Sequence, residues 1–375
     1  MRKILKGICV AACISAIGLG TACATNTQST TEETNMESSI TLSVSRDDKY
    51  PYVDEAREYL STFGADVHNY VFGKTSPCQG IEISWKYEGE PIEGYTVTYA
   101  TKSDYSDGIT VQVDKAREKC LLYNLYKATT YYYCVEATLV GGGTCKAEGT
   151  FKTTDMGPRV MEIDGIYNVR DVGGYKTDSG ARTKQGLFYR GGSLRPADIF
   201  KSDLTEEGQA YMSDVLGIKS DLDIRGMSAE SGNLTTSPIP GAQLKYVALD
   251  GYMGAFRIKE HFRQAFSFLA DKDNYPVYVH CTGGADRTGT LVFLYNALLG
   301  VSEGELIQDY EFTSFSIYGE RNSKAGTTYG DMFQEFLTTL KSYEGETLKE
   351  KTENYLLEIG VTATEIASIR SIMLG

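Results

Sequence analysis

Histidine is scarce in this sequence. The 375 residues include three histidines, His68, His261 and His280, and none of them lies at the spacing of a zinc-binding motif. This scarcity argues against a hydrolase that holds a metal through histidine. We expect neither a metal nor an organic cofactor.

Positive charge and tryptophan are also in short supply. Lys and Arg number 37 against 50 Asp and Glu, and the formal net charge of −13 argues against a broad attraction to nucleic acid or anionic lipid. An anionic substrate must therefore be captured by a local group of residues. A single Trp stands against 27 Tyr. Because tyrosine packs well on pleated, half-buried surfaces, we expect part of the chain to be β-rich.

The N-terminal apolar run, Ile8 to Leu19, is shorter than the roughly 20 residues that cross a bilayer. Basic residues precede this run and small residues follow it, which is the layout of a secretory signal over residues 1–23. The segment ending in Cys23 resembles a bacterial lipoprotein cleavage site, and the resemblance implies a lipid anchor on that cysteine. Simple secretion is the alternative, and an uncleaved membrane helix is a third interpretation.

Residues 24–71 are expected to form a linker with one short helix. Thr, Ser, Asn and Glu dominate up to residue 46, and almost nothing apolar precedes Ile40, as in a solvated tether. The apolar positions between Val53 and Leu60 have helical spacing. We therefore expect no fold before that helix.

Residues 72–155 contain short segments in which apolar and polar residues alternate, namely 81–85, 94–99 and 131–138. Alternation at this spacing predicts an all-β sandwich. The segments resemble a fibronectin type III domain, in which Tyr131 falls at the family's tyrosine corner and Lys127 stands where the family has proline. The resemblance implies a spacer or docking module that contacts a protein or, less readily, a glycan.

Four cysteines fall in the predicted sandwich: Cys78, Cys120, Cys134 and Cys145. Export to an oxidising compartment would permit disulfides among them, and four cysteines allow three complete pairings. Some of them could equally be buried thiols. The sequence leaves these possibilities open.

A third region, residues 159–375, contains the segment Tyr275 to Gly289, which reads as a strand, a glycine-containing loop and a helix. In this arrangement a buried strand delivers Cys281 to the loop, and backbone N–H groups converge on an anion at the helix N-terminus. The two glycines of the loop permit its tight curvature.

The residue types of this loop fit phosphoryl transfer through a cysteine. Cys281 is the predicted nucleophile, because the helix end, the amides and Arg287 favour the thiolate. Arg287 can present its planar fork to two phosphate oxygens. Thr288 is expected to donate its hydroxyl to the cysteine sulfur, and His280 is expected to orient the loop. The predicted phosphate-binding residues are Thr282, Gly283, Gly284, Ala285, Asp286, Arg287 and Thr288.

The stretch His280-Cys281-x-x-Gly-x-Asp-Arg-Thr-Gly resembles the signature of the protein-tyrosine phosphatase superfamily. The segments 168–175, 186–192, 223–230 and 301–312 resemble its bacterial tyrosine/serine branch. A rhodanese-type loop also begins with cysteine, but it does not ordinarily end in Arg-Thr-Gly. The resemblance implies an α/β fold with a central, mostly parallel sheet flanked by helices. It places the site at the carboxyl end of the strand before Cys281.

The leaving group needs a proton donor, and three aspartates compete for that role. Asp286 and Asp223 rank ahead of Asp250, because both match positions within family motifs. Arg170 and Asp171 are expected to form a supporting ion pair beside the loop, with a purely structural role in their turn as the alternative.

The sequence therefore predicts an exported phosphatase, either anchored by lipid or secreted. Its expected substrates are phosphotyrosine and possibly phosphoserine or phosphothreonine in proteins, or small phosphomonoesters. Two alternatives remain: a phosphatase of inositol phosphates or phosphoinositides, and a weakly active protein that only recognises phosphate. The branch commonly has lysine where this chain has Ala285, which disfavours the first alternative. No nucleic acid partner is expected, and membrane contact is expected only through the anchor.

Overall fold

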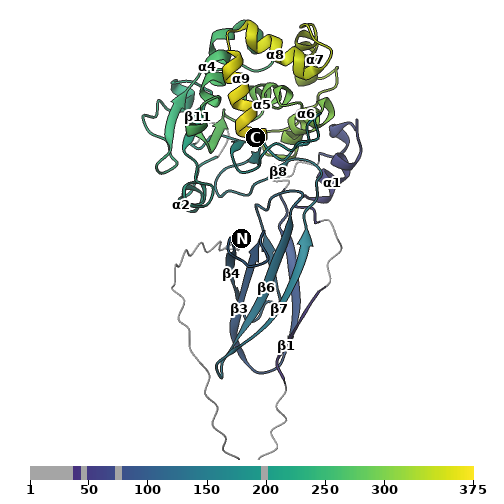
Figure 1. Cartoon of the computed structure of the whole chain (residues 1–375), viewed down its shortest axis with the longest axis vertical. Helices are drawn as coiled ribbons and strands as arrows, with labels where there is room; N and C mark the ends of the chain where they lie inside the picture. The colour runs from purple at the N-terminus through teal and green to yellow at the C-terminus, as the bar shows by residue number, and fades with distance from the viewer. Residues whose placement is uncertain (1–36, 44–48, 72–77, 196–201) are drawn as a thin grey trace, which may run out of the picture. The chain divides into compact units, whose positions relative to one another are not determined.

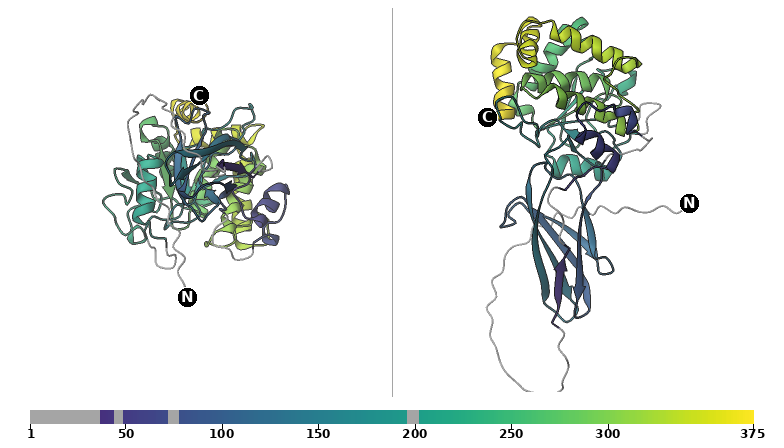
Figure 2. Two further views of the ribbon diagram at one scale, coloured as in Figure 1. Left: turned by 90° about the horizontal axis from the view of Figure 1, so that it is seen from below. Right: turned by 90° about the vertical axis from the view of Figure 1, so that its right-hand side faces the viewer.

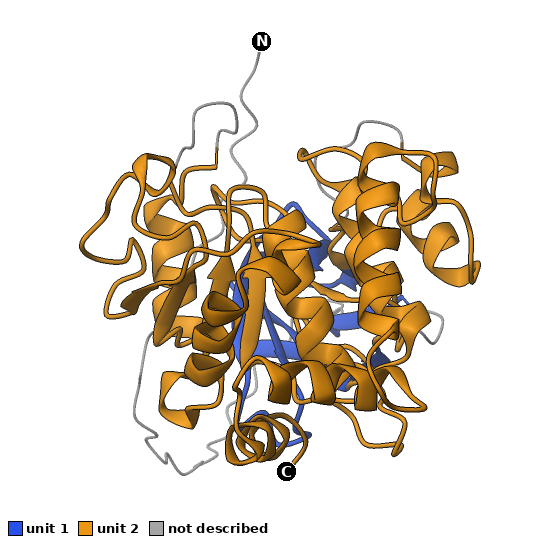
Figure 3. Ribbon diagram, turned by 90° about the horizontal axis from the view of Figure 1, so that it is seen from above, with its two compact units in different colours: residues 1–47, 82–121, 130–152 blue, residues 48–81, 122–129, 153–375 orange. Residues whose placement is uncertain are grey.

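The computed structural model describes residues 37–43, 49–71, 78–195 and 202–375. The predicted signal segment and Cys23 lie outside the described residues. The described chain forms two compact units (Figure 3). Unit 1 takes its residues from 1–47, 82–121 and 130–152, and unit 2 takes its residues from 48–81, 122–129 and 153–375.

Unit 1 is a β-sandwich, as predicted. One sheet has the strand order β1-β2-β5, and the other is antiparallel throughout with the order β4-β3-β6-β7. Trp85 is buried and meets Tyr95 edge-on, with ring centroids 5.0 Å apart. The strands are β1 (Ser39–Leu42), β2 (Ile81–Glu88), β3 (Ile92–Ala100), β4 (Ile109–Asp114), β5 (Lys119–Leu122), β6 (Thr130–Leu139) and β7 (Thr144–Lys152).

The expectation of an unfolded tether was wrong for residues 39–42. These residues form β1, which pairs antiparallel with β2 from Ser39 opposite Glu88 to Leu42 opposite Trp85. Ile40 and Leu42 alternate with polar residues, so this short run can lay one half-buried face on the sandwich. Two apolar side chains at strand spacing were too weak a signal to be read within a polar stretch.

Cys120, Cys134 and Cys145 of unit 1 are thiols, and within the described residues they form no disulfide. Partial burial raises the pKa of the half-buried Cys120 thiol to about 12, which suits an unreactive thiol. Cys78 is also a thiol but belongs to unit 2.

Unit 2 is built on one mixed sheet with the order β12-β11-β13-β10-β9-β8. The four strands from β12 to β10 are parallel, and β9 and β8 are antiparallel additions at one edge. This confirms the predicted fold with a central, mostly parallel sheet. The strands are β8 (Arg159–Val160), β9 (Arg170–Asp171), β10 (Phe188–Gly191), β11 (Ser220–Asp223), β12 (Gln243–Tyr246) and β13 (Val277–His280).

Both faces of this sheet are covered. Along β13, Val277 and Val279 join the large core that contains α5, whereas Tyr278 joins a second core on the opposite face. This alternation follows from the two-residue period of a strand. The whole length of β13 is buried, in keeping with its run of Val277, Tyr278 and Val279 before His280.

The helices of unit 2 gather largely on one side of the sheet (Figures 1 and 2). α5 is buried along nearly its whole length, and α8 and α9 begin with capping boxes at Thr347 and Thr362. The helices are α1 (Asp54–Ser61), α2 (Glu206–Ala210), α3 (Gly254–Arg257), α4 (Lys259–Leu269), α5 (Asp286–Leu298), α6 (Glu303–Glu311), α7 (Thr328–Lys341), α8 (Leu348–Glu358) and α9 (Ala363–Leu374).

No helix in the described part of the chain is long and apolar enough to span a membrane. The same residues contain no group of three or more His, Cys, Asp or Glu side chains gathered as a metal site would require.

Candidate active site

The loop that follows β13 lies at the carboxyl edge of the parallel strands. β13 ends at His280, Cys281 follows at once, and α5 begins at Asp286. Cys281 is only 3% exposed. Because β13 lies between β11 and β10, the cysteine stands at the centre of the sheet edge, where ligands of open α/β sheets bind.

Three consecutive carbonyl groups of this loop, those of residues 282–284, accept hydrogen bonds from outside it. The donors are the Ser193 amide (2.9 Å), Asn168 Nδ2 (2.9 Å) and Arg190 Nη2 (2.7 Å). In a planar trans peptide the C=O and the following N–H point in opposite directions. The N–H groups of residues 283–285 are therefore turned away from these donors, as a phosphate cradle requires.

Two glycines are required by this geometry. Gly284 has φ +64°, and a Cβ there would lie 2.2 Å from the carbonyl oxygen of Gly191. A Cβ at Gly283 would meet the ring of Tyr318 at 2.9 Å. The loop can therefore lie against its supports only because both side chains are absent.

Arg190 belongs to a buried ion network beneath the loop. Asp309 receives Arg190 Nη1 on one oxygen at 2.5 Å and Arg170 Nε on the other at 2.9 Å. Burial acts to raise the pKa of Asp309, but the two guanidinium groups outweigh it and hold that pKa below its usual range. Burial, with a smaller effect of Arg170, lowers the pKa of Arg190 to about 10. A carboxylate held by two arginines thus fixes the underside of the loop.

The predicted ion pair between Arg170 and Asp171 was wrong. Arg170 pairs with Asp309 and donates to Asn168, whereas Asp171 pairs with Arg159 at 2.8 Å. Adjacent residues of a strand point to opposite faces, so these two side chains cannot meet. Arg170 nevertheless supports the loop, because its partner Asn168 is the residue that donates to the Gly283 carbonyl.

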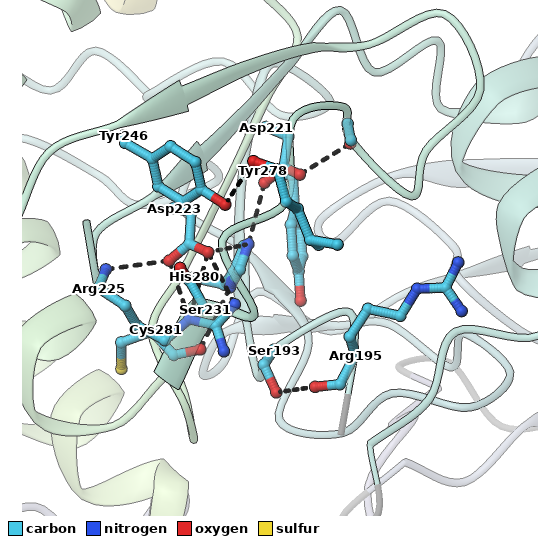
Figure 4. Close-up of polar contacts among 12 residues, drawn as sticks. Ser193, Arg195, Asp221, Asp223, Arg225, Ser231, Tyr246, Tyr278, His280 and Cys281 are labelled. Atoms are coloured by element: carbon cyan, nitrogen blue, oxygen red, sulfur yellow. Dashed lines mark hydrogen bonds and ion pairs between the residues drawn. The ribbon is translucent and has the colours of Figure 1, made fainter. Parts of the chain in front are cut away.

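His280 is held on both ring nitrogens. Nε2 lies 2.9 Å from Asp221 Oδ1, and Nδ1 lies 3.2 Å from the carbonyl oxygen of Cys281 (Figure 4). Burial acts to lower the pKa of His280, but the carboxylates of Asp223 and Asp221 outweigh it and raise the pKa. Both partners of the ring are acceptors, so a doubly protonated ring satisfies both contacts. The geometry agrees with an orienting role for His280.

Arg287 faces a carboxylate. Glu230 receives Arg287 Nη2 on Oε1 at 2.5 Å and Arg287 Nη1 on Oε2 at 3.0 Å, and its Oε1 also accepts from the hydroxyl of Thr282. The hydrogen bonds from Arg287 hold the pKa of Glu230 below its usual range. Arg287 also donates to Thr282 Oγ1 at 3.0 Å. Glu230 therefore uses donors that a bound phosphate would need.

The expected hydrogen bond from Thr288 to the cysteine sulfur does not form in this structure. Thr288 is fully buried, and its hydroxyl has no hydrogen-bond partner among the described residues. Thr288 is therefore a first-turn residue of α5 whose hydroxyl stays unpaired.

Asp223 is a poor proton donor in this geometry. It is buried, and Arg225 donates to both of its oxygens through the backbone N–H (2.9 Å), Nε (2.9 Å) and Nη2 (2.7 Å) (Figure 4). A proton on either oxygen would displace one of these donors. This geometry argues against Asp223 as the proton donor.

Both oxygens of Asp286 are occupied as well. Arg321 Nε lies 2.7 Å from Oδ1 and Arg321 Nη2 lies 3.0 Å from Oδ2, while the Tyr252 hydroxyl donates to Oδ1 at 2.5 Å. The hydroxyl of Tyr252 also lies 2.7 Å from that of Tyr310. Asp286 is thus a charged group paired at the rim of the loop, which its motif position did not reveal.

Asp250 is the open carboxylate of the three candidates. It is exposed, and within the described residues it has no hydrogen bond or ion pair. Its loop is tied to the start of α5, because the Tyr252 amide donates to Thr290 Oγ1 at 2.7 Å and a Cβ on Gly251 would lie 3.1 Å from the Asp286 backbone. Asp250 is therefore carried beside the cysteine loop with its oxygens available.

The supporting residues that sequence reasoning missed are Asn168, Arg190, Asp309 and Arg321. Asn168 and Arg190 lie in segments that resemble the family. The resemblance marked these segments but did not indicate what either side chain does. Asp309 likewise lies in the segment 301–312, which resembles the family, but nothing in the local sequence around Arg321 pointed to the loop, since it acts across more than 20 residues of chain.

Comparisons with known proteins agree with this architecture. The tyrosine phosphatase family model matches residues 161–375, and the fibronectin type III domain model matches residues 67–151. A Cupriavidus necator protein that carries the name of a tyrosine-protein phosphatase is 26% identical over 174 residues, which cover 41% of this chain and 63% of that protein. A tyrosine-protein phosphatase of Nostoc commune is 34% identical over 59 residues, which cover 16% of this chain and 20% of that protein. The chain thus spans less than two thirds of either relative.

Solved structures give weaker likenesses. The core catalytic domain of the PP-IP phosphatase SIW14 from S. cerevisiae has a TM-score of 0.29 at 18% identity, covering 41% of this chain and 84% of that chain. The fn3 domain of human collagen alpha-1(XX) has a TM-score of 0.19 at 27% identity, covering 21% of this chain and 77% of that chain. Likenesses at these scores say nothing about substrate.

The family match spans more than half of the 375 residues and includes the whole cysteine loop with its supports. The chain therefore belongs to the tyrosine phosphatase family, as its loop motif predicted.

Proposed function

We propose that this protein hydrolyses phosphate monoesters through a phosphocysteine on Cys281. The observation that carries the proposal is the loop itself: a buried cysteine at the end of β13, three outward-tied carbonyls after it, and Arg287 at its far end. Inward N–H groups together with a guanidinium stabilise the charge that develops on a transferring phosphoryl group.

In the first step the Cys281 thiolate attacks phosphorus, the bond from phosphorus to the ester oxygen breaks, and the leaving alcohol or phenol takes a proton from a carboxylic acid. In the second step water attacks phosphorus, the sulfur leaves as thiolate, and the carboxylate takes a proton from that water. Arg287 holds two oxygens of the phosphoryl group throughout.

We assign the proton transfer to Asp250. The oxygens of Asp223 and Asp286 already accept hydrogen bonds from Arg225 and Arg321, whereas the carboxylate of Asp250 is exposed and unengaged among the described residues. A donor must be able to carry its proton on an oxygen that points to the leaving group.

Glu230 must give way when phosphate binds. Its carboxylate takes two donors of Arg287 and the hydroxyl of Thr282. A phosphate dianion carries more charge and more acceptor oxygens than a carboxylate, so it can replace Glu230 on these donors. Glu230 then sets how tightly phosphate is held.

Phosphotyrosine in proteins is the proposed substrate class, and phosphoserine and phosphothreonine are weaker substrates. The family supports this proposal. The loop has Ala285 where a lysine would add charge for polyanionic headgroups, which disfavours inositol phosphates. A screen of phosphotyrosine peptide, phosphoserine peptide and inositol phosphates separates these classes.

We also propose that the protein is exported and anchored by lipid on Cys23. The support is the sequence of residues 1–23 alone. Fatty-acid labelling in a bacterial host tests the anchor. The wild type should carry the label and Cys23→Ala should lose it. A wild type without the label would indicate simple secretion.

The first experiment is hydrolysis of 4-nitrophenyl phosphate by the full chain with EDTA and a reductant present. Cys281→Ser should abolish turnover, while Cys145→Ser, which removes a thiol of unit 1, should retain it. Activity that EDTA removes, or that survives in Cys281→Ser, would contradict the cysteine mechanism. A wild type without turnover on any phosphoester would contradict the proposed activity and favour a protein that only recognises phosphate.

A further inference from the structure

The segment before the sandwich is built into unit 2. Residues 49–71, here termed the strap, contain α1 and a short 3-10 helix, Val67–Asn69. Tyr52, Ala56, Tyr59, Leu60 and Val67 are buried together with Val160, Phe312 and Phe315. α1 lies beside α6, and Gln308 Nε2 donates to the carbonyl of Leu60 at 3.3 Å (Figure 1). A linker would not bury this much of its apolar surface.

The strap holds one loop of unit 2 through polar contacts. This loop, residues 320–324, is termed the Arg321 loop. Asn322 is buried and donates from Nδ2 to Asp66 Oδ1 at 2.6 Å. Lys324 Nζ lies 3.9 Å from Asp66 Oδ2, and His68 Nδ1 lies 2.9 Å from Glu320 Oε2. Three of the loop's five side chains thus contact the strap.

A buried carboxylate adds a further connection. The hydroxyl of Tyr59 donates to Glu311 Oε2, and the Ser323 amide donates to Glu311 Oε1 at 2.7 Å. Burial raises the pKa of Glu311. Glu311 therefore joins α1 directly to the backbone of the Arg321 loop.

The remaining long side chain of the loop faces the catalytic site. Arg321 pairs side-on with both oxygens of Asp286, at 2.7 and 3.0 Å, and its guanidinium lies over the ring of Tyr329, 3.8 Å from the centroid. Asp286 immediately precedes Arg287, and its side chain is 32% exposed. Without a cation beside it, this charge would repel a phosphate on Arg287.

We propose that the strap is a working part of the phosphate site: it fixes the Arg321 loop so that Arg321, a positioning residue, keeps Asp286 neutralised and turned away from the bound phosphate. The proposal rests on the function proposed above. Asp286 here is a charge to be neutralised, and the proton donor is a different residue. Phosphate affinity therefore depends on contacts made by a segment that precedes the sandwich in sequence.

The test measures binding of inorganic phosphate to the full chain by calorimetry, beside kcat and KM on 4-nitrophenyl phosphate. Arg321→Met should weaken phosphate binding about fivefold, since one uncompensated charge near the site costs on the order of 1 kcal/mol. Arg321→Lys keeps the charge and should lose about threefold or less. KM should rise in parallel while kcat changes little.

A double variant isolates the cause. If Arg321 acts by neutralising Asp286, then Arg321→Met should have less than about a twofold effect in an Asp286→Asn background, because the charge it compensates is gone. An equal loss in both backgrounds would overturn the neutralising role. It would instead assign Arg321 a direct contact with phosphate or a purely structural role.

The strap is tested by Asp66→Asn, which removes the charge facing Asn322 and Lys324, with Asp54→Asn as the control. Among the described residues, Asp54 pairs with Arg57 alone, on the exposed side of α1. Asp66→Asn should weaken phosphate binding about threefold, and Asp286→Asn should again suppress the effect. Asp54→Asn should match the wild type.

Two results would overturn the role of the strap. One is an Asp66→Asn variant that lowers the melting temperature without changing phosphate affinity. The other is a loss of affinity that Asp286→Asn does not suppress. Because calorimetry needs no turnover, an inactive wild type that still binds phosphate would contradict the proposed function while leaving the strap fully testable.

Discussion

Arg190 lies beneath the cysteine loop and donates from Nη2 to the carbonyl oxygen of Gly284 at 2.7 Å. The same side chain pairs with Asp309, so one buried cation connects α6 to the loop. The bond fixes the peptide between Gly284 and Ala285, whose N–H is turned to the opposite side. Arg190 therefore orients the Ala285 N–H, and with it the partial positive charge of that group, from the other side of the peptide.

Arg190→Lys should disable the loop. Lysine cannot span Asp309 and the Gly284 carbonyl as a planar fork does, so we expect kcat/KM to fall about a hundredfold or more. Lysine keeps the charge beside Asp309, but a buried hydrogen bond to the Gly284 carbonyl is lost, which destabilises by about 1–3 kcal/mol. Urea denaturation and steady-state kinetics measure both effects. Arg370→Lys, at the partly exposed pair with Glu353, should cost less than about 1 kcal/mol and leave kcat/KM unchanged.

Gly284→Ala should abolish turnover, because the new Cβ would lie 2.2 Å from the oxygen of Gly191 and the backbone has φ +64°. Gly319→Ala is the matched control: it also has positive φ, +80°, but nothing lies within 4 Å of its Cβ. Strain from positive φ alone costs roughly 1 kcal/mol, so the control should fold and remain active. Comparable losses of turnover in both variants would point to strain rather than close approach.

Glu230→Gln should strengthen inhibition by inorganic phosphate. The neutral amide competes less well for the two donors of Arg287, so we expect the inhibition constant to fall about three- to tenfold. Glu260→Gln, which neutralises the exposed carboxylate paired with Arg263, should leave it unchanged. A weaker inhibition in Glu230→Gln would mean that Glu230 orients Arg287 for phosphate instead of competing with it.

Asp250→Asn should reduce kcat far more for phenyl phosphate than for 4-nitrophenyl phosphate. The poorer leaving group depends more on a proton donor, and loss of a general acid typically costs 10²- to 10⁴-fold. Asp223→Asn and Asp286→Asn should change the two substrates to a similar extent. If the unequal loss appears in one of these two variants instead, that residue is the donor.

The stability of unit 2 should depend on the charge of His280. Burial acts to lower the pKa of His280, and the carboxylates of Asp223 and Asp221 raise it above the ordinary 6.5. A raised folded-state pKa contributes stability that is fully present below about pH 6.5 and is lost as pH rises through the folded-state pKa.

Asp221→Asn should therefore cost the most stability near pH 6 and less near pH 9, as measured by urea denaturation at each pH. Burial lowers the pKa of Lys127 to about 8. Because Lys127 titrates in the wild type and in Asp221→Asn alike, its contribution cancels in the difference between their free energies of unfolding. A stability difference that stays constant with pH would mean that His280 does not change its charge between pH 6 and pH 9, and would contradict this prediction.

Much of the fold follows from local pattern. Alternation in segments such as Ile81–Trp85 predicts the sandwich. The strand, loop and helix around Cys281 carry the family resemblance that implies the α/β fold and the place of the cysteine. The short strand β1 escaped notice, because two apolar residues carry little periodicity. These signals are readable because they depend on neighbours within a few residues.

The sequence by itself determined the chemistry of the loop, since Cys281, the glycines and Arg287 lie within seven residues of one another and share one strand-to-helix connection. Only the tertiary structure decided what surrounds it: that Arg170 pairs with Asp309, that Arg321 pairs with Asp286, and that Asp250 keeps its carboxylate open. The reason is physical. The charge and size of a side chain follow from its residue type alone. Its hydrogen-bond partner is whichever group the packed core brings within about 3 Å, and that group can come from any distance along the chain.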